Sequence, residues 1–128
     1  MITIDNDGTI TLYQGDGGEL VISGLDKSKS YKVYFAIQDE NRNSVGEELQ
    51  VAISNTDTVT FVLTPEYTDL LEVPKNKAYK IYYYGIKVCE VGTSIEDTLF
   101  IADSTYGDLN RLIVYPRKVK GGYNESEK

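Results

Sequence analysis

Alternation between large apolar residues and mostly polar or small ones limits the folds open to this chain. Residues 31–39 read YKVYFAIQD, residues 58–63 read TVTFVL, and a shorter stretch, LQVAI, repeats the pattern at 49–53. Alternate side chains of an extended chain point to opposite faces, so the pattern predicts antiparallel strands with one face on a core. The residues expected to point inward are Tyr31, Val33, Phe35, Ile37, Leu49, Val51, Ile53, Val59, Phe61 and Leu63.

Turn-forming residues separate these strands from further ones. Gly, Asn, Asp and Ser gather at 5–8, 14–18, 24–30, 39–46 and 55–57. Further strands are expected at Ile10–Tyr13, Glu19–Ser23, Ala78–Glu90, Thr98–Ala102 and Leu112–Tyr115. About seven or eight short strands with such turns predict an all-β fold, an antiparallel immunoglobulin-like β-sandwich, with an up-and-down barrel as the alternative.

A single domain is expected over residues 1–119, followed by a flexible polar tail at 120–128. One segment of that domain breaks the β pattern. Thr64 is a plausible N-cap and Pro65 suits the first helical position, so a short helix is predicted over residues 65–71. The helix residues expected to face inward are Tyr67, Leu70 and Leu71.

The stretch AYKIYYYGIKVC at 78–89 is apolar on both faces, so its orientation needs a separate argument. The residues assigned to the core are Tyr79, Ile81 and Tyr83. A bulge at Gly85 is expected to return Ile86 and Val88 to the same core. The tyrosines then left as candidates for a contact surface are Tyr34, Tyr82, Tyr84 and Tyr106, since tyrosine is enriched at protein interfaces.

Several kinds of chemistry are excluded by residues that the sequence lacks. There is no histidine, which removes histidine-based catalysis and metal sites, so we expect no enzyme, no cofactor and no metal. The DNDG motif at 5–8 lacks the acidic positions of a calcium loop and predicts a hairpin turn. The adjacent pairs Glu47/Glu48 and Glu96/Asp97 are expected to be solvated, and Cys89 to be a buried structural thiol.

Charge and hydropathy restrict the partners. The 13 basic and 20 acidic residues give a net charge of −7, which disfavours nucleic acid and anionic membranes. No stretch approaches the about 20 apolar residues that span a bilayer, and the N-terminal residues do not resemble a signal peptide. Synthesis in the cytoplasm, with no membrane insertion, is therefore expected.

A family resemblance suggests where such a fold works. In order, TFVLTPEYTDLL (60–71), AYKIYYYGIKV (78–88) and EDTLFIADSTYGDLNRLIVYPRKV (96–119) resemble the N-terminal domain of the phage baseplate upper protein family. The resemblance implies a non-enzymatic structural module of a phage virion, made in the bacterial host cytoplasm, that binds other tail or baseplate proteins or itself. The alternatives are a carbohydrate-binding module for the host surface and a capsid-decorating or head-fibre protein.

Overall fold

The computed structural model describes residues 2–5, 8–99 and 110–118 of the chain. Its elements are, in order, β1 (Thr3–Ile4), β2 (Ile10–Tyr13), β3 (Gly18–Ile22), β4 (Ser30–Gln38), β5 (Ser44–Ser54), β6 (Val59–Leu63), α1 (Pro65–Asp69), β7 (Lys80–Glu90), β8 (Glu96–Leu99) and β9 (Arg111–Tyr115). The strand predicted at Thr98–Ala102 therefore begins earlier, at Glu96, and the last three residues of the predicted range lie outside the described ranges. Tyr106 and the tail at 120–128 also lie outside them.

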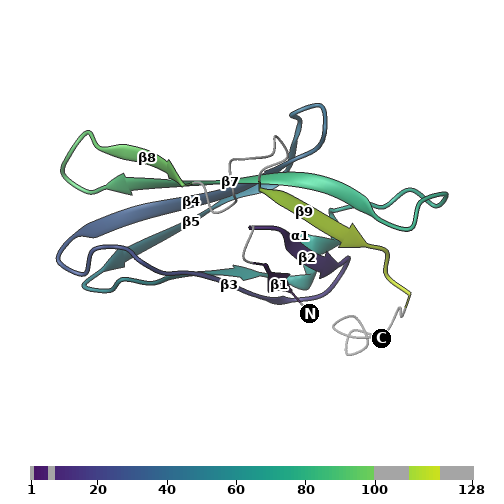
Figure 1. Ribbon diagram of the computed structural model, residues 1–128, viewed down its shortest axis with the longest axis horizontal. Coiled ribbons are helices and arrows are strands. Elements are labelled where there is room, and N and C mark those ends of the chain that lie inside the picture. The colour runs from purple at the N-terminus through teal and green to yellow at the C-terminus, as the bar shows by residue number, and fades with distance from the viewer. Residues whose placement is uncertain (1, 6–7, 100–109, 119–128) are drawn as a thin grey trace.

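Two sheets pack face to face (Figure 1). The larger has the strand order β1-β2-β9-β7-β4-β5, with β8 also paired to β7, and the smaller consists of β3 and β6. Strand β2 runs parallel to β9, and the other described pairs are antiparallel. The predicted all-β sandwich is confirmed, and the single parallel pair is the departure from a purely antiparallel arrangement.

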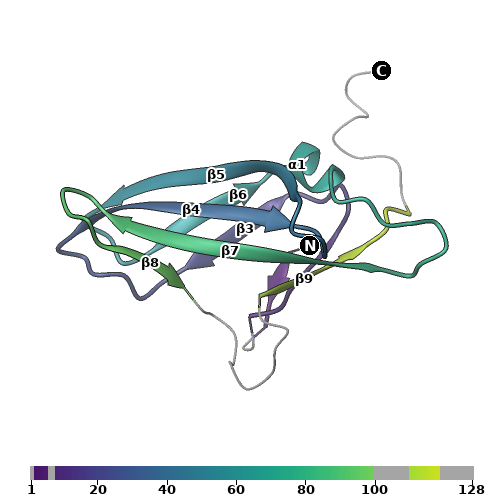
Figure 2. The ribbon, with the colours of Figure 1, turned by 90° about the horizontal axis from the view of Figure 1, so that it is seen from above.

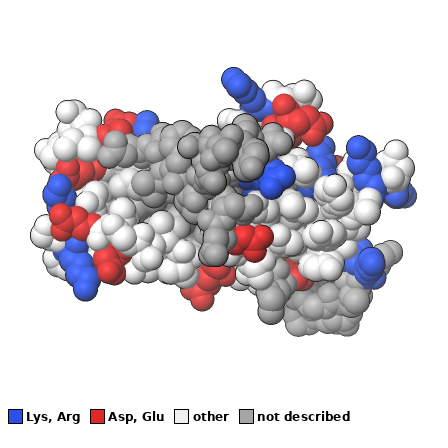
Figure 3. Space-filling view, in the orientation of Figure 1, with Lys and Arg blue, Asp and Glu red and all other residues white. Residues whose placement is uncertain are grey.

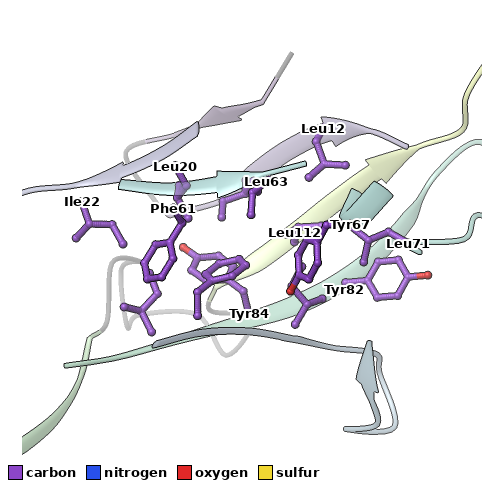
Figure 4. Packing of buried hydrophobic residues seen from close by; sticks show 14 of the residues in the cluster. Leu12, Leu20, Ile22, Phe61, Leu63, Tyr67, Leu71, Tyr82, Tyr84 and Leu112 are labelled. Carbon is purple, nitrogen blue, oxygen red and sulfur yellow. The ribbon is translucent and has the colours of Figure 1, made fainter. Parts of the chain in front are cut away.

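The core lies between the two sheets (Figure 4). The alternating residues of β4 and β6 are buried as predicted, and both Phe35 and Phe61 are 0% exposed. The Phe35 ring lies 5.6 Å from that of Phe61 and 5.7 Å from that of Tyr84, centroid to centroid, so it joins the two sheets. The predicted inward residues that remain half-buried are Tyr31, Leu49, Val51 and Ile53.

The orientation predicted for β7 is wrong. Tyr82 and Tyr84 are only 4% and 6% exposed, whereas Tyr79 is 46% exposed. The pairing of β7 with β4 is continuous through Gly85, which lies opposite Ala36, so β7 has no bulge there. Without a bulge, the two buried tyrosines share a face with the buried residues Ile86 and Val88, and Tyr79, Ile81 and Tyr83 lie on the opposite face.

Hydrogen bonds allow the two tyrosines of β7 to enter the core. The Tyr84 hydroxyl donates to the backbone oxygen of Gly8, and the Tyr82 hydroxyl donates to that of Glu72, each at 2.6 Å. A buried phenol needs such a partner, because an unpaired polar group inside a protein is costly. Both bonds also fix β7 to loops, one of them distant in sequence at Gly8 and the other shortly before the strand at Glu72.

The helix is confirmed, although it is shorter than predicted. The Thr64 hydroxyl accepts a hydrogen bond from the backbone N–H of Tyr67 at 3.1 Å, as an N-cap should, and Pro65 occupies the first helical position. Tyr67 and Leu71 are buried as expected. Leu70 is 52% exposed, so its inward assignment is wrong. Because α1 ends at Asp69, Leu70 and Leu71 lie beyond the helix and do not share one helical face.

Candidate functional site

Most of the tyrosines predicted to form a contact surface are not available for that role. Tyr82 and Tyr84 are core residues, and Tyr106 falls outside the described residues. Tyr34 is half-buried on the outer face of the large sheet, opposite Gln50 of β5 and Lys87 of β7. Of the three described candidates, Tyr34 therefore lies on a surface as predicted, whereas Tyr82 and Tyr84 point into the core and not outward.

The polar motifs behave as ordinary structural features. Gly8 donates to the backbone oxygen of Asp5 at 3.0 Å, and β1 pairs antiparallel with β2, so the predicted hairpin turn is confirmed. Glu47 and Glu48 are exposed, as expected for a solvated pair. Cys89 is half-buried, which corrects the prediction of a buried thiol.

Within the described ranges, no cluster of three or more metal-ligating side chains occurs. A search of the same ranges for a helix long and apolar enough to cross a membrane found none.

An aromatic cluster lies at one end of the large sheet. The ring of Tyr115 is 5.4 Å from that of Tyr13 and 6.0 Å from that of Tyr79, centroid to centroid. Tyr13 and Tyr79 are each 46% exposed. Lysines precede and follow Tyr79 in the turn and the start of β7, and basic side chains gather at this end of the molecule (Figure 3). Sequence analysis missed this surface because it assigned Tyr79 to the core.

A second surface is the free edge of β5. This strand ends the described order of the large sheet, and Figure 2 shows it along the outer edge of that sheet. Its second half, 49–54, reads LQVAIS and carries no charge, proline or glycine. Leu49, Val51 and Ile53 are half-buried and pack against the core, whereas Gln50 and Ala52 are exposed.

The direction of the β5 backbone follows from a hydrogen bond made by β4. The backbone oxygen of Ser30 accepts from the N–H of Val91 at 2.9 Å, so the backbone groups of Ser30 point toward β7. These groups alternate in direction along a strand, so those of Tyr31, and of every second residue after it, point toward β5. The residues of β5 opposite them, and so bonded to β4, are Leu49, Val51 and Ile53. The backbone groups of Gln50, Ala52 and Ser54 consequently point away from β4, toward the free edge.

The first half of β5 is protected against further pairing. The register with β4 shifts between Phe35, opposite Leu49, and Ile37, opposite Val45, so β5 bulges there. Gly46 within the bulge has φ of 73°, a left-handed conformation that suits glycine. The Tyr67 hydroxyl donates to the backbone oxygen of Glu47 at 3.1 Å. A bulge, or a backbone oxygen that already accepts a side-chain hydrogen bond, hinders pairing at a sheet edge. Residues 49–54 have neither feature.

The Tyr67 hydroxyl also gives this region a pH dependence. Burial raises the pKa of Tyr67 from 10.0 to about 12, and the charge of Glu47 adds to the effect. Because the folded state favours the neutral phenol, the stabilisation is fully present below about pH 10 and is lost as the pH rises through about 12.

We expect the free energy of unfolding of the wild type to fall by roughly 2–3 kcal/mol more than that of Tyr67→Phe across this window. Urea denaturation of both proteins at pH 9 and at pH 12 measures the difference. The phenylalanine variant keeps the other tyrosines and so controls for their titration. Parallel declines of the two proteins would contradict the assignment.

Comparison with solved structures identifies proteins of the same fold. The structure resembles that of the periplasmic chaperone SfaE over 95% of this chain and 60% of that one, with a TM-score of 0.59 and 9% sequence identity. It also resembles the E. coli chaperone DraB over 91% of this chain and 55% of that one, with a TM-score of 0.57 and 12% identity. The chain thus spans somewhat more than half the length of either chaperone. No family model matches the chain, and no curated protein matches its sequence.

These neighbours confirm the immunoglobulin-like sandwich and correct the predicted function. SfaE is a periplasmic chaperone and DraB is a chaperone, and neither is a phage baseplate protein, so the prediction of a phage virion module is wrong. Its two alternatives find no support in these neighbours. Both neighbours are named as chaperones and neither as an enzyme, and the absence of enzymatic activity in this chain stays a prediction. The location in a virion, after synthesis in the cytoplasm, was a separate prediction and stays one.

Proposed function

We propose that this protein is a non-enzymatic protein-binding module that holds an extended segment of another polypeptide against β5. The observation that carries the proposal is the open half of that strand, residues 49–54. There the backbone groups of Gln50, Ala52 and Ser54 point to the free edge, and no bulge or charge opposes pairing. Both solved neighbours are named chaperones, a class of proteins that bind other polypeptides.

Strand addition supplies affinity and selectivity through different groups. Main-chain hydrogen bonds to the edge give affinity, and alternate side chains of the added segment give selectivity. On the inner face of β5, Leu49, Val51 and Ile53 are half-buried, so a partner with apolar side chains at alternate positions would extend the core at this edge. A sequence-tolerant contact of this kind needs no pocket and no catalytic group.

A proline at Ala52 should weaken this binding without unfolding the protein. The N–H of Ala52 points to the free edge, so its loss removes a donor to the added strand but no hydrogen bond to β4. Proline is tolerated on edge strands in this orientation. The probe is a fluorescent peptide of alternating valine and threonine with a lysine at each end. We expect its affinity to fall about tenfold or more in Ala52→Pro, measured by fluorescence anisotropy.

Matched variants separate strand addition from other effects. Ala52→Ser keeps the N–H and should bind the peptide as the wild type does. Val51→Pro removes a hydrogen bond to β4 and should instead lower the stability of the fold. Equal binding of the peptide by Ala52→Pro and by the wild type, with both folded by circular dichroism, would overturn the proposed edge.

A further inference from the structure

We infer that the polypeptide added to β5 is β5 of a second copy of this chain, paired antiparallel across a two-fold axis at Val51. The inference rests on the proposed function, since it names the partner that adds to the same edge. In this register Val51 lies opposite Val51 of the second copy. Leu49 lies opposite Ile53 of the second copy, and the reverse pair follows from the symmetry.

The apolar pattern of the open half is self-complementary. Leu49, Val51 and Ile53 point to the inner face, are half-buried and pack against the core. The two-fold register pairs each of them with another member of the same set. Cross-strand pairs of branched apolar residues stabilise an antiparallel sheet, so the dimer covers the apolar side chains that β5 leaves half-open. The two large sheets then form one continuous sheet through both copies.

The direction of the backbone groups fits the same register. Gln50 lies opposite Ala52 of the second copy, and both residues point their N–H and C=O to the free edge. These residues therefore form hydrogen-bonded pairs on each side of the axis. Val51, whose own groups bond to β4, forms a non-hydrogen-bonded pair at the axis, where the two Cα atoms approach to about 4.5 Å.

Charge does not oppose this contact, although the chain as a whole is acidic. A net charge of −7 repels copies from one another, but residues 49–54 carry no charge. The register places Glu48 opposite Ser54 and Glu47 opposite Asn55, so no two like charges face each other. An edge without a charged or bulged protector is the kind that pairs with another chain.

The neighbouring two-fold register is less favourable. An axis at Ala52 would place Leu49 opposite Asn55 of the second copy. Asn55 has φ of 60°, a left-handed conformation that follows the last residue of β5. That arrangement would remove Leu49 from the apolar contact and oppose it to a polar residue beyond the strand. The axis at Val51 keeps all three apolar pairs and is therefore the register we assign.

Disulfide trapping of the full chain tests the register. In a Cys89→Ser background, Val51→Cys should cross-link to its own copy under mild oxidation, because the paired residues come within disulfide distance. The control is Val62→Cys, on the outer face of the small sheet, where the side chain is 60% exposed and random collision is easier. We expect Val51→Cys to cross-link on the order of tenfold faster than the control. A mixture of Leu49→Cys and Ile53→Cys chains should cross-link to each other.

Preferential trapping between Val51→Cys and Ile53→Cys chains would instead indicate the axis at Ala52 and overturn the assigned register. The wild type should also sediment as a dimer that Ala52→Pro converts to a monomer. A monomeric wild type, with Val51→Cys no faster than Val62→Cys, would overturn the self-pairing. In that case, weaker binding of the valine–threonine peptide by Ala52→Pro than by the wild type would still support strand addition by another polypeptide. If the wild type is monomeric and Ala52→Pro also binds the peptide as tightly as the wild type does, the proposed function is overturned as well.

Discussion

Replacement of both Tyr82 and Tyr84 by serine should leave the protein largely unfolded at 25 °C. Both side chains are nearly fully buried, and the Tyr84 ring stacks on that of Phe35 at a centroid distance of 5.7 Å. Loss of a buried aromatic side chain costs about 3–5 kcal/mol, so two losses together approach the total stability of about 5–15 kcal/mol of a small domain. Two loop hydrogen bonds would be lost as well. Circular dichroism and urea denaturation measure the result.

Single variants distinguish loss of packing from loss of the hydrogen bond. Tyr84→Phe keeps the ring but leaves the backbone oxygen of Gly8 without the phenol donor, and should cost about 1–3 kcal/mol. Tyr83→Ser is the matched control, because Tyr83 is half-buried on the outer face, and it should cost about 1 kcal/mol or less. A stable double variant that lost only an interaction with a partner would restore the outward orientation predicted from sequence.

Truncation of the phenylalanines between the sheets should have the next largest effect. Phe35 and Phe61 are 0% exposed, lie on opposite sheets and are 5.6 Å apart, centroid to centroid. Phe35→Ala and Phe61→Ala should each lower the free energy of unfolding by about 3–5 kcal/mol, because each leaves a cavity in the core. Urea denaturation with an unchanged slope would attribute the change to stability alone.

The same pair allows a coupling measurement. Because the two rings are in contact, the double variant should lose less stability than the sum of the single losses, by about 0.5–1.5 kcal/mol. Val62→Ala on the outer face of β6 is the control and should cost well under 1 kcal/mol. Losses below about 1 kcal/mol for both phenylalanines would mean that the inner faces of β4 and β6 are not the core.

Much of the fold could be predicted because its signals are local. The alternation in β4 and β6 assigned Phe35 and Phe61 to the core, since one face of each strand is apolar throughout and the other carries polar residues. The N-cap Thr64 and the following Pro65 located α1, because capping depends on neighbouring residues alone. Turn residues at 5–8 likewise predicted the hairpin that joins β1 to β2.

The sequence by itself determined the all-β class, the main strands and the helix start, because side-chain period and capping are properties of short segments. Only the tertiary structure decided which face of β7 enters the core. Both faces of that strand are rich in tyrosine, and the choice depended on an unbroken register at Gly85 and on hydrogen bonds to carbonyls outside the strand, at Gly8 and Glu72. It also decided that β5 is an edge of the sheet formed by the described residues. A strand becomes an edge through the absence of a neighbour, which no residue within Ser44–Ser54 encodes.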